Sequence, residues 1–165
     1  MGHNQEYLRE VGMQLGRVEV RSGKIEEGYE EEGAMVDFAN AEVGGGFLGN
    51  GSAQEEILFS IFPELTVIKL ICEELKEEEA VVVRGARRFN TYEGYSKSFR
   101  FLGNYGDGYD GDRAGKSVII AVDAVDFSRG LMKKEMQYQK KYFKREMHKF
   151  FVGVEQALDP FFYEE

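Results

Sequence analysis

The sequence has little cysteine, proline or histidine and no tryptophan: one Cys, two Pro and two His in 165 residues. Cys72 cannot form an intrachain disulfide, which excludes a disulfide-stapled scaffold. His3 and His148 show no spacing typical of a metal site or a catalytic triad, so we expect no metal and no cofactor. No apolar run approaches the ~18 residues of a membrane span, and the N-terminus lacks the apolar core of a signal peptide. We therefore expect an intracellular protein, cytoplasmic or nuclear, with no membrane partner.

Acidic residues outnumber basic ones. The chain has 21 Lys and Arg against 30 Asp and Glu, a formal net charge of -9. Such a balance opposes broad, non-specific binding to a polyanion, so we predict no direct nucleic-acid binding. A phosphate-bearing ligand would have to be held by local features of the fold.

Residue patterns predict strands and helices in alternation along one domain. Helical spacing starts at Ser52, is interrupted at Pro63 and continues to about Lys76, with Cys72 expected as a buried thiol; a second helical pattern covers 130–158. A glycine-rich stretch, 103–115, reads as a mobile surface loop. Alternating or β-branched runs predict strands at 14–20, 34–39, 79–84, 95–102 and 117–122. The interleaving favours an α/β fold with a mixed sheet.

A glycine tract after the 34–39 strand admits three interpretations. Gly44, Gly46 and Gly49 fit G-x-G-x-x-G, the dinucleotide-binding fingerprint. In that fold the turn passes almost directly into its helix, whereas residues 50–52 intervene here. No acidic residue ends a second strand about 20 positions later, because Glu64 lies within the helical segment. The dinucleotide interpretation is therefore the weakest of the three.

The second interpretation is a helix cap, and the third is a ligand-binding loop. Ser52 at N-cap and Glu55 at N3 would form a capping box, which explains Glu55 but neither Glu56 nor Gln54. Successive glycines let peptide groups approach phosphates or ribose hydroxyls, and the helix N-terminus behind them adds a positive dipole end.

The stretch GGGFLGNGSAQEE, residues 44–56, resembles the signature loop of poly(ADP-ribose) glycohydrolases, with three glycines, a short spacer and Gln-Glu-Glu. The flanks agree, and the similarity runs from about residue 25 to 127: VDFAN at 36–40, ILF at 57–59, PEL at 63–65, TYEGY at 91–95 and AVDA at 121–124. The resemblance implies one catalytic domain over 1–165. It also implies a macrodomain-like three-layer α/β/α sandwich with a mixed sheet, C-terminally incomplete.

The same resemblance implies hydrolysis of the ribose-ribose O-glycosidic bonds of poly(ADP-ribose), releasing ADP-ribose. Glu56 would be the general acid, with Glu55 beside it. The residues implied to bind substrate, poly(ADP-ribose) or ADP-ribose, are Ile25, Glu26, Asp37, Asn40, Gly44, Gly45, Gly46, Gln54, Tyr92 and Tyr95. Glu55 and Asn40 would hold ribose hydroxyls, Ile25 and Glu26 would contact adenine, and Gln54 would shape the loop.

Several of these residues also have structural interpretations. Tyr92 and Tyr95 could be strand packing, Asp37 a buried structural carboxylate, and Asn40 a turn residue. A glutamate near a helix N-terminus is favoured as the anion, whereas a general acid must carry a proton. We expect the diphosphate charge and the desolvation of the bound substrate to favour the protonated Glu56.

The chain departs from the family after Phe127. Its members continue into a second glycine-rich loop for the diphosphate and an aromatic residue that stacks on adenine, whereas this chain has a basic helical segment at 130–158. We expect that segment to turn an apolar stripe toward the sheet, and a second chain or the missing C-terminal segment to cover an exposed sheet edge. The alternative function is an ADP-ribose-binding module or an inactive fragment of such a protein.

Overall fold

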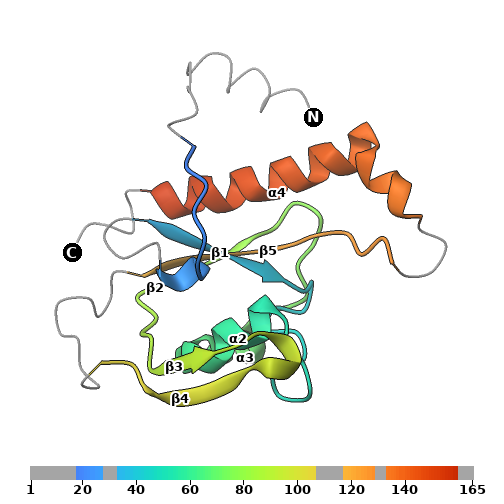
Figure 1. The fold of residues 1–165 in the computed structure, drawn as a ribbon. Helices are drawn as coiled ribbons and strands as arrows, with labels where there is room; N and C mark the ends of the chain where they lie inside the picture. Colours follow the sequence, from blue (N-terminus) through green and yellow to red (C-terminus); the bar gives the residue numbers. More distant parts are fainter. Residues whose placement is uncertain (1–17, 28–32, 107–116, 129–132, 160–165) are drawn as a thin grey trace.

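The computed structural model describes residues 18–27, 33–106, 117–128 and 133–159, which form a three-layer α/β/α arrangement (Figure 1). Helix α4 covers one face of a central sheet, and α2 and α3 lie on the other face with a small hairpin beyond them. The elements in chain order are η1 (Ile25–Glu27), β1 (Ala34–Ala39), α2 (Gln54–Ile61), η2 (Pro63–Val67), α3 (Ile68–Ile71), β2 (Val81–Arg84), β3 (Asn90–Glu93), η3 (Ser96–Ser98), β4 (Arg100–Asn104), β5 (Val118–Asp123), η4 (Lys134–Tyr138) and α4 (Lys140–Leu158).

The central sheet is mixed, with the described strands in the order β1-β5-β2. β1 and β5 run parallel in a register that pairs Ala34 with Val118 and Ala39 with Asp123, and β2 is antiparallel to β5. The middle strand is the most buried: Ile119, Ile120 and Ala121 are nearly inaccessible to solvent. Because β1 and β5 are parallel, their carboxyl ends meet at one edge, where the glycine tract begins.

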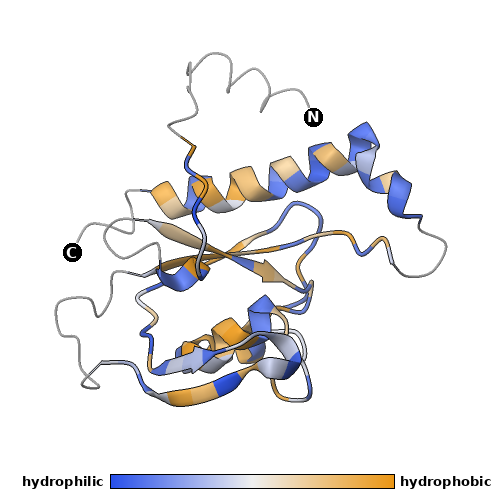
Figure 2. Cartoon of the chain, viewed as in Figure 1, coloured by the Kyte–Doolittle hydropathy of each residue, from blue (hydrophilic) through white to orange (hydrophobic). Residues whose placement is uncertain are grey.

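The main core lies between this sheet and the α2–η2–α3 segment. Phe59, Phe62 and Leu65 are completely buried there, against Met35 of β1 and Ile119 of β5. Fully burying one such side chain contributes about 1.5–3 kcal/mol relative to exposure. Figure 2 shows apolar residues along the central strands and on α2, which faces the sheet. The packing fixes the N-terminal end of α2 beneath the carboxyl end of β1.

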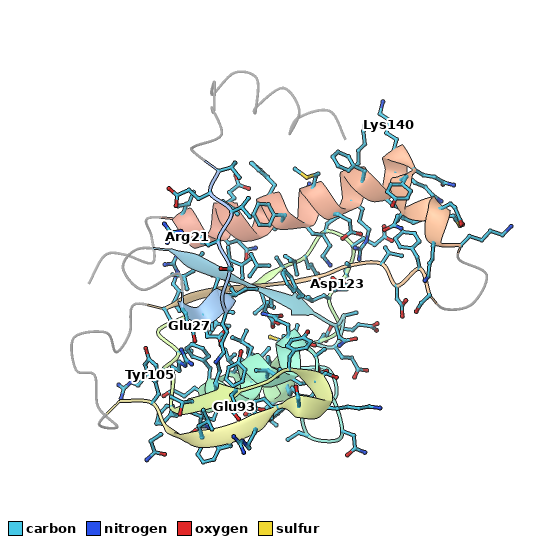
Figure 3. The ribbon with its side chains drawn as sticks, in the orientation of Figure 1. Arg21, Glu27, Glu93, Tyr105, Asp123 and Lys140 are labelled. Atoms are coloured by element: carbon cyan, nitrogen blue, oxygen red, sulfur yellow. The ribbon has the colours of Figure 1, made fainter. Side chains whose placement is uncertain are left out.

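On the opposite face, α4 binds the sheet through polar and small residues. Lys149, fully buried, donates to the Asp123 carboxylate and to the Lys76 carbonyl oxygen, and Arg145 donates to Asp123 Oδ2 at 2.9 Å. Figure 3 shows Asp123 between the sheet and α4, at the end of β5. Further along, a Cβ added to Gly153 would lie 2.4 Å from Ile120, so glycine permits the close helix–sheet contact.

The predicted orientation of this helix is therefore wrong. Phe143, Met147 and Phe150 are 63%, 53% and 44% exposed instead of facing the sheet. The reason is that Asp123 at the end of β5 requires cations, so the Lys149 side of the helix turns inward. Lys140, at the N-terminal end of α4 in Figure 3, extends outward.

The strand predictions for 34–39, 79–84 and 117–122 are confirmed by β1, β2 and β5. The strand expected at 95–102 begins only at Arg100, after the η3 turn, and its partner β3 was not predicted. Residues 14–17 lie outside the described part, and 18–20 form no strand. Of the predicted loop 103–115, residues 103–104 belong to β4, whereas 107–116 lie outside the described part.

The helical predictions were partly confirmed. The first pattern ends at Ile71 rather than near Lys76, and Cys72 is exposed rather than buried, since it follows the last turn of α3. The second pattern is confirmed as η4 and α4, although 130–132 lie outside the described residues. Among the described helices, none is both long and apolar enough to cross a lipid bilayer.

Candidate active site

The glycine tract folds back tightly against the start of α2. Gly44 has φ +91° and Gly45 has φ +43°, in the left-handed region that favours glycine. A Cβ added to Gly45 would lie 2.5 Å from Asn40 Nδ2, 2.6 Å from Glu56 Oε1 and 2.7 Å from Glu55 Oε2. The absence of a side chain at this position lets one backbone residue contact both glutamates and the asparagine.

Glu55 is the fully buried carboxyl of the site. Its Oε2 accepts hydrogen bonds from Asn40 N at 3.0 Å and Asn40 Nδ2 at 2.9 Å, and its Oε1 accepts one from Gly44 N at 2.5 Å. Burial raises the pKa of Glu55 above its ordinary value, and the hydrogen bonds from Asn40 and Gly44 oppose that rise. Both of its oxygens are occupied by protein donors, so Glu55 orients the loop.

Glu56 bridges the loop and the helix start. Its Oε1 accepts from Gly46 N at 3.1 Å and its Oε2 accepts from Ala53 N at 2.8 Å. A Cβ added to Gly51 would lie 2.6 Å from Glu56 Cγ, so this glycine makes room for the carboxyl side chain. Glu56 is thus held in one position by backbone groups on either side of the spacer.

The predicted helix cap is shifted by one residue. The N-cap is Ala53 and Glu56 occupies N3, so the reach-back to the cap N–H that the sequence assigned to Glu55 belongs to Glu56. Ser52 instead lies with its Oγ 3.4 Å from Ser96 Oγ, which connects the helix start to η3. The shift places Glu55 on the buried side of α2, where it reaches Asn40.

Gln54 completes hydrogen bonds along the free edge of β1. Its Oε1 accepts from Phe38 N at 2.9 Å, and its Nε2 donates to Val36 O at 3.1 Å. Among the described strands, β1 pairs only with β5, which leaves its other edge without a strand partner. Over part of that edge, the Gln54 amide makes the hydrogen bonds that a neighbouring strand would make. The Phe38 side chain nevertheless remains 62% exposed.

Asp37 lies beneath the two glutamates on β1, almost completely buried. Burial raises the pKa of Asp37 to about 8, and the neighbouring charges of Glu55 and Glu56 add to the rise. Its Oδ1 has no hydrogen-bond partner in the described structure. The raised pKa favours the protonated form of Asp37, which limits the negative charge in this cluster.

The residues implied to contact adenine form a second cluster with the β3 tyrosine. Glu26 is buried next to Tyr92, and Lys24 Nζ lies 4.0 Å from the Tyr92 ring centroid and donates to Tyr92 O at 2.7 Å. Burial raises the pKa of Tyr92, and a hydrogen bond with Glu26 adds to that effect. Ile25 is 41% and Tyr95 is 56% exposed, so both side chains are accessible to a ligand.

The structure thus brings Asp37, Asn40, Gln54 and the two glutamates together around residues 44–46. No hydrogen bond is recorded between this group and the Glu26–Tyr92 cluster among the described residues. Sequence reasoning missed two members of the site, Gly51 and Lys69. The available signal for Lys69 was a single charge in the otherwise apolar stretch that follows Thr66. Within the described residues, no group of three His, Cys, Asp or Glu could hold a metal ion.

Comparison with known proteins identifies the family. Residues 5–160 match the family described as "Poly (ADP-ribose) glycohydrolase (PARG), Macro domain fold". The chain belongs to this family. The macro-domain fold of the family agrees with the mixed sheet and the flanking helices, so the predicted fold class and the predicted resemblance are both confirmed.

Individual relatives agree with this membership. Poly(ADP-ribose) glycohydrolase 1 of Arabidopsis thaliana is 40% identical over 122 residues, covering 73% of this chain and 22% of that protein. Probable poly(ADP-ribose) glycohydrolase 2 of the same plant is 35% identical over 142 residues, covering 84% and 26%. Poly(ADP-ribose) glycohydrolase 1 of Caenorhabditis elegans is 46% identical over 67 residues, covering 41% and 9%. The matches therefore span about a quarter or less of the length of these relatives.

Proposed function

We propose that this chain hydrolyses the ribose-ribose O-glycosidic bonds of poly(ADP-ribose) and releases ADP-ribose, with Glu56 as the general acid. The observation that carries the proposal is the different environment of two adjacent glutamates. Glu55 accepts hydrogen bonds from three N–H donors, whereas Glu56 is held by two backbone groups and is slightly more accessible, 7% against 1% exposed. The relatives named poly(ADP-ribose) glycohydrolase support the choice of substrate.

The division of roles follows from these contacts. Protonated Glu56 gives its proton to the leaving ribose oxygen as positive charge develops at the anomeric carbon. The resulting Glu56 carboxylate then accepts a proton from the water that attacks that carbon, which restores the starting state. Glu55 and Asn40 hold each other and the loop in place, and we assign them the ribose hydroxyls.

The remaining predicted residues are assigned roles in binding the substrate. We propose that the backbone of Gly44, Gly45 and Gly46 forms the close approach to the substrate, because glycine places no Cβ between its peptide groups and a ligand. At Gly44 and Gly45 an added Cβ would also lie within 2.7 Å of a neighbouring side chain. Ile25 and Glu26 are proposed to contact adenine, with Tyr95 packing near the substrate from the hairpin side. Asp37 limits the charge beneath the glutamates, and Gln54 fixes the start of α2 to β1.

A general acid must carry a proton when the substrate is bound. Glu56 accepts hydrogen bonds from two backbone N–H donors near the N-terminus of α2. We propose that the diphosphate charge of the bound substrate and the exclusion of water favour the protonated side chain once the substrate is in place.

The test compares three proteins incubated with poly(ADP-ribose), with free ADP-ribose followed over time: the unchanged chain, Glu56→Gln, and Glu74→Gln as a control at an exposed glutamate. The proposal predicts release by the unchanged chain and by Glu74→Gln, and loss of release by Glu56→Gln. Equal release by all three proteins would remove Glu56 from the mechanism.

The alternative, an ADP-ribose-binding module, has its own outcome. Calorimetry with ADP-ribose would then give micromolar affinity for the unchanged chain while no ADP-ribose is released from the polymer. If the chain neither binds ADP-ribose nor releases it from the polymer, it is an inactive fragment. These outcomes separate recognition of the ligand from turnover.

A further inference from the structure

Lys69 contacts the glycine tract from the side opposite the glutamates. From α3, its Nζ donates to Gly45 O at 2.9 Å and makes a longer contact with Val43 O at 3.5 Å. A Cβ added to Gly44 would lie 3.0 Å from both Cγ and Cδ of Lys69. The lysine stem therefore packs against the tract while its ammonium group binds two of its carbonyl oxygens.

Those two carbonyls belong to the same peptide units that bind the glutamates. The carbonyl of Val43 and the N–H of Gly44 share one planar peptide group, and the carbonyl of Gly45 shares another with the N–H of Gly46. The Gly44 N–H donates to Glu55, and the Gly46 N–H donates to Glu56. In a trans peptide the C=O and N–H point in opposite directions, so each unit has the Lys69 cation at one end and a carboxyl group at the other.

We propose that Lys69 is a positioning residue, which orients the two peptide units that hold Glu55 and Glu56 and strengthens their N–H donors. Hydrogen bonds in a chain polarise one another, and a cation at the carbonyl end makes the N–H at the other end a stronger donor. A single side chain thereby acts on both glutamates without touching either of them. No other cation donates to a carbonyl of residues 43–46 among the described contacts.

The glycines and the lysine depend on each other in this arrangement. The positive φ angles of Gly44 and Gly45 turn alternate carbonyls toward α3, and without Lys69 these oxygens would lack the cation that balances them. Loss of Lys69 lets the two peptide units rotate away from the glutamates. The proton of Glu56 must reach a single substrate oxygen, so even a small rotation lowers the rate of the reaction.

The catalytic consequence rests on the proposed function, but the positioning can be measured without any substrate. Lys69→Met keeps most of the stem and removes the charge, Lys69→Arg keeps the charge, and Lys76→Met is the control at a surface lysine whose side chain is 73% exposed. Two-dimensional NMR of the ligand-free proteins reports the amide protons of Gly44 and Gly46 through their chemical shifts and hydrogen exchange.

We expect Lys69→Met to move both glycine amide protons upfield and to accelerate their exchange on the order of fivefold. Lys69→Arg is expected to restore both readouts, and Lys76→Met to leave them unchanged. With poly(ADP-ribose), Lys69→Met is expected to lower kcat on the order of 10- to 100-fold with a smaller change in KM, and Lys69→Arg to recover most of kcat.

Unchanged Gly44 and Gly46 amides in folded Lys69→Met would overturn the proposal, whatever the activity. If the methionine variant does not fold, Lys69→Gln, which keeps a hydrogen-bond donor without the charge, carries the same comparison. An unchanged chain that releases no ADP-ribose would count against the proposed function alone. Altered amides restored by arginine would still support the positioning role in that case.

Discussion

Two buried carboxyl groups at the same end of the sheet are stabilised in different ways. Glu55 is held by N–H donors from Asn40 and Gly44, all of them uncharged. Asp123 pairs in register with Ala39, the residue before Asn40, and is held by the cations of Lys149 and Arg145. The glycine tract thus binds carboxyl groups through oriented peptide dipoles, and α4 binds one through ion pairs.

The difference shows how each region serves the molecule. Peptide dipoles fix a carboxyl without neutralising it, so the cluster of Asp37, Glu55 and Glu56 keeps ionisable groups close together, as acid-base chemistry requires. Paired cations neutralise Asp123 and connect α4 to the sheet, which is a structural role. The expected effects of substitution therefore differ between the two regions.

The largest expected effect on stability is at Lys149. Lys149→Met leaves buried Asp123 with Arg145 alone, and we expect the free energy of unfolding to fall by about 3 kcal/mol. Urea unfolding followed by circular dichroism measures the change, with Lys140→Met at the exposed start of α4 as the control. Equal stability of the two variants would mean that the ion pairs do not hold this helix.

In the glycine tract, the position most sensitive to added volume is Gly45. Gly45→Ala should cost about 1–3 kcal/mol, because its Cβ would overlap Asn40 and both glutamates, and ADP-ribose release should be lost with it. Gly106→Ala is the matched control, since Gly106 also has a positive φ of +62° but no described residue lies within 4 Å of an added Cβ. Similar losses for the two variants would attribute the effect to backbone strain alone.

Asp37 should make stability depend on pH. Its pKa is about 8 in the folded protein against an ordinary 3.8, so between these values the folded state binds more protons than the unfolded state. Stability should then fall as pH rises through this window, by at most about 1.4 kcal/mol per pH unit from Asp37. Urea midpoints at pH 5 to 8.5 should show a smaller slope for Asp37→Asn, and an unchanged slope would contradict the buried, protonated state.

The smallest effect is expected on the outer surface of α4. Phe143→Ser should change stability by no more than about 0.5 kcal/mol, because this side chain is largely exposed. Gly153→Ala should destabilise, although alanine favours helices, because the added Cβ meets Ile120. If Phe143→Ser strongly lowers the free energy of unfolding and Gly153→Ala does not, the apolar side of α4 faces the sheet, as the sequence predicts.

The sequence predicts the glycine region better than α4 for a physical reason. Positions 44–46 and 54–56 are constrained by close backbone contacts, which require glycine and particular polar side chains. The residue types at these positions therefore predict the local structure. In α4 the apolar period is real, but Asp123, which turns the Lys149 side inward, lies 26 residues away from that lysine in the sequence. Helical periodicity alone does not report such a partner.

The same limit explains the two errors near the site. Whether Ser52 or Ala53 caps α2 depends on the path of the spacer around Gly51, so a one-residue shift moved the capping contact from Glu55 to Glu56. Lys69 was missed because its partners are backbone carbonyls, so the single charge in the apolar stretch after Thr66 did not indicate what it contacts. Both features depend on three-dimensional backbone positions rather than on local pattern.

The most direct test of the account is the rate of ADP-ribose release from poly(ADP-ribose) by Glu56→Asp. This variant keeps the carboxyl group and shortens the side chain by one methylene, so the oxygens can no longer reach both Gly46 N and Ala53 N. The account predicts a fall in kcat on the order of 100-fold with the fold intact. A rate close to that of the unchanged chain would contradict the claim that the glycine tract fixes the position of the catalytic carboxyl.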